Sequence, residues 1–256
     1  MLKRLRIIGL CLVAIFALSA VGASSAMAEH LEVGKCKSVA KTGKWEDSNC
    51  TKALAEGNFE WEALKANVPF TSTSGVKKLI SGAGTIECKK DKNVGELTGT
   101  MTDTVQITFE ECTTLGGLVS CSSSGAGSGV IKTNTLESKL SWLKRAAPMT
   151  VGLDLAPKAP ATEFTAFTCL TENIRVGGSV IGAITPLNTM STKASLELKC
   201  SPAGSTKQQY TKDEGEPTDT LTISVNGGAP GVACEEEVTS DQITFSQTVE
   251  IWAAFP

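Results

Sequence analysis

The chain has 256 residues with 24 Lys and Arg, 27 Asp and Glu and a single histidine, which gives a formal net charge of −3. Three of the 24 basic residues precede residue 29, so a chain that starts there carries 21 basic and 27 acidic side chains, a net charge of −6. A mildly acidic chain without a basic block is a poor match to nucleic acid, and we expect no nucleic-acid partner.

The first 28 residues have the three parts of a cleavable secretory signal. A basic start at residues 1–6 is followed by an apolar run at residues 7–20 and by Ala-Met-Ala at residues 26–28. A membrane-spanning helix needs about 20 apolar residues, and this run is shorter. We therefore expect cleavage before Glu29 and a secreted, extracellular protein without a stable membrane anchor.

Eight cysteines follow this segment, and an even number in an exported chain predicts four disulfides. Zinc sites usually contain close Cys-x-x-Cys or Cys/His pairs, and no two of these cysteines are that close. We therefore expect no metal ligand and no cofactor. The expected pairs are Cys36–Cys50, Cys88–Cys169, Cys112–Cys121 and Cys200–Cys234.

These pairs differ in how they are inferred. Cys36–Cys50 and Cys112–Cys121 are short local closures, the second across a turn-like Thr-Thr-Leu-Gly-Gly segment. Cys200 and Cys234 lie on either side of one segment near the C-terminus that contains a predicted strand. The remaining pair follows by elimination, because eight cysteines allow 105 connectivities.

Along the chain, the region 51–65 is left open between helix and strand, and from about residue 84 apolar and polar side chains alternate as in half-buried strands. The alternating segments are 103–109, 151–155, 196–200, 220–225 and 243–251. The stretch 136–146 fits either a helical turn, through Leu140 and Leu143, or a strand, and we favour the strand. Turn clusters rich in glycine separate these segments at 82–84, 122–129, 177–178 and 226–230.

Many short strands separated by glycine-rich turns predict an all-β fold, either an antiparallel β-sandwich or a flattened β-barrel, stapled by disulfides. After the signal segment 1–28, we expect a single all-β domain over residues 29–256. Within it, a small disulfide loop region at 29–66 precedes the sandwich at 67–256.

The usual catalytic motifs are missing. Hydrolytic triads need a general base, usually histidine, and the sole candidate, His30, lies beside the expected cleavage site. A G-x-S-x-G elbow, a G-x-G-x-x-G fingerprint and a P-loop are absent from the sequence. We therefore expect no catalytic or nucleotide-binding residue of these classes.

Carboxylates are the remaining candidates for catalytic groups. A glycosidase needs two of them about 5–10 Å apart, and acidic clusters occur at Glu110-Glu111, at 213–216 and at 235–237. Acidic side chains are mostly exposed, so we expect these clusters to be solvated turns and strand ends. The acidic loop 212–219 contains oxygens that suit calcium, but it lacks the EF-hand order, and we expect a solvated loop there too.

Aromatic side chains that stack on sugars are the other candidate. Trp45, Phe59 and Trp61 fall in one stretch, and Tyr210 is the only tyrosine. Because aromatic residues make up only 5% of the chain, we expect Phe59 and Trp61 to be core anchors first and a sugar platform second.

The N-terminal pattern of Cys36, the Gly-Lys-Trp-Glu-Asp-Ser-Asn-Cys segment at 43–50 and the Gly-Asn-Phe-Glu-Trp segment at 57–61 resembles a known group of sequences. The stretch 105–112 with Cys121 is similar to the same group. This is an uncharacterised family of exported, cysteine-bearing β proteins from high-GC Gram-positive soil bacteria, with no assigned activity. The resemblance implies secretion and a bacterial source, and it transfers no catalytic or binding residue.

Together these features favour a non-catalytic extracellular module, either structural or binding a cell surface or an extracellular glycan. The alternative is a carboxylate-dependent secreted glycoside hydrolase. The hydrolase requires an Asp/Glu pair that faces across a cleft lined with aromatic residues.

Overall fold

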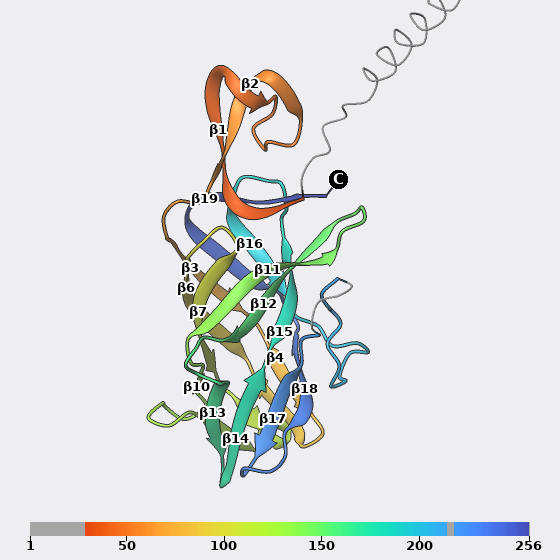
Figure 1. Ribbon diagram of the computed structural model, residues 1–256. Coiled ribbons are helices and arrows are strands. Elements are labelled where there is room, and N and C mark those ends of the chain that lie inside the picture. Colours follow the sequence, from red (N-terminus) through yellow and green to blue (C-terminus); the bar gives the residue numbers. More distant parts are fainter. Residues whose placement is uncertain (1–28, 214–217, 256) are drawn as a thin grey trace, which may run out of the picture. The chain divides into compact units, whose positions relative to one another are not determined.

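A computed structural model describes residues 29–213 and 218–255, and the expected signal segment lies outside these residues. The regular elements of the described chain are β-strands and one 3-10 turn, η1 (Leu115–Gly117). The predicted all-β, antiparallel, disulfide-stapled fold is therefore confirmed. The strands form two closed eight-stranded barrels, here called barrel I and barrel II, whose labelled strands can be followed in Figure 1.

Barrel I closes because β19, its last strand, pairs with β16 on one side and with the first strand, β3, on the other. Its strands in spatial order are β3 (Val68–Ser74), β6 (Lys90–Leu97), β7 (Thr102–Glu110), β11 (Leu136–Lys144), β12 (Thr150–Pro157), β15 (Val180–Thr185), β16 (Ser191–Glu197) and β19 (Asp241–Ala254). The short strand β10 (Ile131–Lys132) pairs with β7. A long hairpin of β1 (His30–Trp45) and β2 (Ala53–Ala63) extends the sheet beside β19. The segment 51–65, for which the sequence did not decide between helix and strand, is therefore largely strand.

Barrel II is a second meander whose spatial order also follows the chain. Its strands are β4 (Lys77–Ser81), β5 (Gly84–Cys88), β8 (Thr113–Thr114), β9 (Val119–Ser122), β13 (Glu163–Cys169), β14 (Glu172–Gly178), β17 (Leu221–Val225) and β18 (Gly231–Glu237). The predicted turns 82–84 and 226–230 lie between β4 and β5 and between β17 and β18.

The chain alternates between the two barrels. After β3, β7, β12 and β16 it leaves barrel I, forms one hairpin of barrel II and returns. Several crossings are short: residues 75–76, Lys89, Ser179 and residues 238–240. Strands of one barrel therefore lead directly into strands of the other. The region of these crossings is here called the waist, and the four hairpin turns of barrel II lie at the end of that barrel away from the waist.

The glycine pair 177–178 ends strand β14 directly before such a crossing and does not form a turn as predicted. Gly178 ends β14 with a φ of 90°, and the chain continues through Ser179 into β15. A Cβ atom at Gly178 would lie 2.0 Å from the carbonyl oxygen of Thr220. The close approach of β17 therefore requires glycine here.

The core follows the alternation predicted from the sequence. Val105 and Ile107 of β7 are buried in barrel I, while their neighbours of opposite parity are exposed or part-buried. Leu153 and Leu155 of β12 are buried there too, with part-buried Asp154 between them. Ile223 of β17 is buried in the same way in barrel II. Among the described residues no helix is long and apolar enough to cross a membrane.

Four disulfides are present, and two of the predicted pairs are wrong. Cys36–Cys50 and Cys200–Cys234 are confirmed. The other four cysteines pair as Cys88–Cys112 and Cys121–Cys169, in place of the predicted Cys88–Cys169 and Cys112–Cys121. Four disulfides indicate an oxidising, extracellular type of environment.

Strand register explains the correct pairs. Lys90 lies opposite Glu110 in the β6–β7 ladder, and Glu87 lies opposite Thr113 in the β5–β8 ladder. Cys88, at the end of β5, and Cys112, between β7 and β8, lie between these two pairs and therefore face each other. Cys121 and Cys169 are direct partners in the β9–β13 ladder. The predicted hairpin after Cys112 does exist, since the N–H of Cys121 donates to the carbonyl of Cys112, but each sulfur bonds across a different ladder.

Replacing Cys88 and Cys112 together by alanine should lower the free energy of unfolding by about 3 kcal/mol, because a loop of 24 residues is no longer closed in the unfolded chain. Urea denaturation at fixed pH measures the change. A peptide map under non-reducing conditions in which Cys112 is joined to Cys121 would contradict the register.

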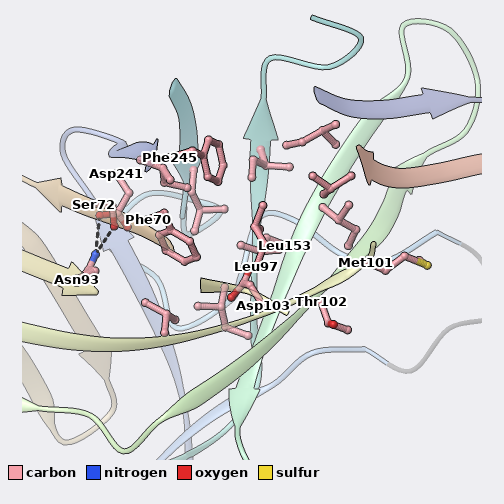
Figure 2. A pocket seen from close by; sticks show the side chains of 18 of the residues that line it. Phe70, Ser72, Asn93, Leu97, Met101, Thr102, Asp103, Leu153, Asp241 and Phe245 are labelled. Carbon is pink, nitrogen blue, oxygen red and sulfur yellow. Dashed lines mark hydrogen bonds between the residues drawn. The ribbon is translucent and has the colours of Figure 1, made fainter. Parts of the chain in front are cut away.

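Barrel I also buries an acidic side chain, Asp103 of β7, which is 3% exposed and lies opposite Ser138 in the β7–β11 ladder. Its Oδ1 atom has no hydrogen-bond partner in the structure. Burial raises the pKa of Asp103 from 3.8 to about 6. Figure 2 shows this carboxylate among the apolar side chains that line a small cavity of barrel I, Leu97 and Leu153 among them.

A carboxyl group whose pKa is higher in the folded state stabilises the fold only while it is protonated. The contribution of Asp103 is therefore present below about pH 4 and is lost as the pH rises through about 6. Asp103→Asn should raise the free energy of unfolding at pH 7 by about 2–3 kcal/mol and leave it unchanged at pH 3. Urea denaturation from pH 3 to pH 8 tests this, and an equal effect at both ends would refute the assignment.

Candidate functional site

A cavity of about 370 Å³ lies at the end of barrel II where the hairpin turns are. Ile86 of β5, Ile174 of β14 and Ile223 of β17 contribute to its lining, which is mostly apolar, and Glu172 is the one charged residue in it. Small-molecule sites are concave, mostly apolar and about 300–1,000 Å³ in volume. This cavity has those properties.

Three exposed leucines lie in the turns at this end of the barrel. Leu115 and Leu118 belong to the β8–β9 turn and are 69% and 86% exposed, and Leu170 in the β13–β14 turn is 78% exposed. Leu115 and Leu170 also line the cavity. Large apolar side chains gathered at an exposed rim are typical of a surface that contacts a ligand or partner.

Two of these leucines also have an unfavourable backbone conformation. Leu115 and Leu170 have φ angles of 52° and 56°, in the left-handed region. A residue with a Cβ atom loses roughly 1–2 kcal/mol there, and two-residue hairpin turns such as Leu170-Thr171 usually contain Asn or Gly. Backbone strain of this kind concentrates at functional positions.

The rim is held in place by neighbouring turns. The side-chain amide of Asn226, in the β17–β18 turn, donates to the carboxylate of Glu172, which directly follows Leu170-Thr171. The N–H of Asn173 donates to Oδ1 of Asn226 at 2.8 Å. Cys169, on the other side of Leu170, is covalently tied to Cys121 of β9. The cavity is therefore largely pre-formed.

A second polar constellation lies at the waist, around the buried side chain of Lys77. Its Nζ atom is 2.7 Å from Asp241 Oδ2 and 2.9 Å from Asp91 Oδ2. Glu237 and Glu235 carboxylate oxygens lie 3.6 and 3.7 Å away. Burial opposes the charged ammonium, but the four carboxylates together hold the pKa of Lys77 well above its usual range.

These carboxylates share one cation. Burial raises the pKa of Glu237 to about 8 and also raises those of Glu235 and Asp241, while the charge of Lys77 acts in the opposite direction. The side chain of Asn93 donates to Ser72, as Figure 2 shows, and also to Asp241. The cluster is an internal ion network that joins strands of both barrels. In the part of the chain that the structure describes, no group of His, Cys, Asp and Glu side chains could hold a metal ion.

The prediction that residues 235–237 are solvated is therefore wrong for Glu237, which is buried. It is only partly right for Glu235, which is part-buried. Glu237 lies opposite Lys77 in the β4–β18 ladder, and Glu235, two residues away, faces the same side. Glu110 and Glu111 do lie in surface ion pairs with lysines, as expected of solvated acids.

The acidic loop 212–219 forms an ion network of its own. Lys212 Nζ lies 2.6 Å from Asp154 Oδ2 and 3.2 Å from Asp219 Oδ1, so an ammonium group occupies the position between two carboxylates. Asp213 pairs with Arg145 at 2.9 Å. Glu214 and Glu216 lie outside the described residues.

The aromatic residues pack against one another at the β1–β2 hairpin. Trp252 of β19 contacts Trp45 and Trp61 with ring centroids 5.3 and 4.8 Å apart, and His30 stacks on it at 4.3 Å. Phe59 packs against the same cluster. The sequence-based view of Phe59 and Trp61 as core anchors agrees with this packing, which leaves the rings in contact with each other. Tyr210 donates to Glu197.

No known protein family, curated protein or solved structure matches this chain. The candidate site therefore rests on its geometry. Sequence reasoning missed the rim leucines, although the Leu-Gly-Gly-Leu segment at 115–118 places large apolar residues in an evident turn.

Leu170→Asn should raise the free energy of unfolding by about 1 kcal/mol, because asparagine tolerates the left-handed conformation and the exposed leucine loses little burial. Leu118→Asn is the matched control: Leu118 is equally exposed but has a φ of −81°, so no gain is expected. Urea denaturation of both variants measures the difference. Equal stability changes in the two would show that Leu170 is not strained.

Proposed function

We propose that this protein is a secreted, non-catalytic extracellular binding module that takes a small apolar ligand, or the apolar part of a larger one, into the far end of barrel II. The observation that carries the proposal is the apolar cavity of about 370 Å³ rimmed by exposed leucines, two of them in strained turns. Apolar surface buried on binding stabilises a complex by roughly 25 cal/mol per Å².

The location rests on two independent features. The N-terminal segment has the pattern of a cleavable secretory signal, and the four disulfides favour an oxidising compartment. The resemblance to exported bacterial proteins is consistent with the same location. We therefore propose that the binding site operates outside the cell.

The geometry favours an apolar ligand over a glycan. Sugar sites usually expose flat aromatic faces, whereas Trp45 and Trp252 are buried in the cluster at the β1–β2 hairpin. The glycoside hydrolase alternative needs two carboxylates across one cleft, and the described lining of this cavity contains only Glu172. The binding module is therefore the better-supported proposal.

The neutral fluorophore N-phenyl-1-naphthylamine tests the proposal. We expect saturable binding with one site per chain, and Ile174→Trp should weaken it at least tenfold because the indole fills the cavity. Val94→Trp, at an exposed position of barrel I, is the control and should bind as the unsubstituted protein does. Fluorescence titration measures the dissociation constant, and circular dichroism checks that each variant is folded. Absence of saturable binding, or equal binding by Ile174→Trp, would refute the proposal.

A further inference from the structure

The cavity at the end of barrel II is the first of three in succession. A second cavity of about 70 Å³ lies at the waist, lined by residues of both barrels, and a third of about 50 Å³ lies inside barrel I (Figure 2). Ile86 lines both the first and the second cavity. Ile107, Leu155 and Asp241 are among the residues that line both the second and the third. Neighbouring cavities thus share lining residues.

Ile86 is placed to act as a partition. It lies in the middle of β5, between Leu79 of β4 and Thr114 of β8 in the ladder, and it is buried. Its side chain therefore projects into the barrel between the first two cavities. A shorter side chain at this position would join the inner space of about 70 Å³ to the outer cavity.

The charges on either side of this partition restrict the ligand. The charged residues that line the inner cavity are Lys77, Lys78, Glu235 and Asp241. Four carboxylates surround the ammonium group of Lys77, and Lys78 pairs with Glu87. The outer cavity contains one charged residue, the carboxylate of Glu172. Neither end offers an unpaired cation to an anionic group, and burying an ionised group without a partner is costly.

We propose that the ligand is a single unbranched alkyl chain with a neutral or cationic head group, that it enters with its methyl end first, and that Ile86 sets the longest chain that can be fully buried. This inference rests on the proposed function and assigns its ligand class and its specificity-determining residue. The head group stays at the rim, beside Glu172 and the exposed leucines, and the methyl end stops at Ile86.

The test is a series of 1-alkanols from hexanol to tetradecanol that displace N-phenyl-1-naphthylamine. Each further buried methylene should tighten binding about fourfold until the chain reaches the partition, after which the dissociation constant should level off. In Ile86→Ala the levelling point should move to chains at least two carbons longer. Ile174→Ala is the control, because Ile174 lines the outer cavity alone and its loss widens the site without opening the partition.

Two further measurements complete the design. Ile86→Phe should move the levelling point to shorter chains, which keeps the test decisive if Ile86→Ala does not fold. An alkanoate should bind at least tenfold more weakly than the alkanol or alkyltrimethylammonium ion of equal chain length. An unchanged levelling point in both Ile86 variants would overturn the role of Ile86, and equal affinity for the alkanoate would overturn the head-group assignment. If the unsubstituted protein binds neither fluorophore nor alkanol, the proposed function itself fails, and the inference fails with it.

Discussion

The ammonium group of Lys77 holds the two barrels together at their waist. Lys77 begins β4 of barrel II, and it contacts Asp91, the second residue of β6, and Asp241, the first residue of β19, both in barrel I. Asp241 is 164 residues away along the chain, so this contact joins the two ends of the interleaved meander. Removing one partner from a buried ion cluster costs about 3–5 kcal/mol because the remaining charges are left uncompensated. The strand crossings pass this point, and the cavities lie on both sides of it.

The same cluster determines the chemistry of the interior. Glu235 and Glu237 bring the number of carboxylates around Lys77 to four, and burial raises the pKa values of both, that of Glu237 to about 8. The waist is therefore polar, but the ammonium group of Lys77 is already paired with carboxylates. Such a floor disfavours a buried anion, because an ionised group buried without a partner is costly.

Much of the fold could be predicted from the sequence because strand alternation is a local signal. The segment 103–109 and the final segment from residue 243 both form the strands that their period-two pattern predicts. The division into two barrels could not be predicted, because a crossing such as Gly178-Ser179 has the same composition as a hairpin turn. The pairing of Cys88 with Cys112 needed the register of β6 with β7, which spacing alone does not contain. The burial of Glu237 likewise depended on Lys77, 160 residues earlier, lying opposite it.

The candidate site arises from uneven strand lengths around barrel II. The interior of an eight-stranded barrel is just wide enough for its own side chains to fill it. In barrel I most strands have seven or more residues, and the remaining cavity is about 50 Å³. In barrel II, β8 and β9 have only two and four residues, so this part of the wall supplies few inward side chains. The space that they leave is the cavity of about 370 Å³, and Leu115 in the turn that joins them lies at its rim. A strand of two to four residues is too short to show an alternating pattern in the sequence. The residues that create this cavity could therefore be identified only once the structure showed how the barrel closes.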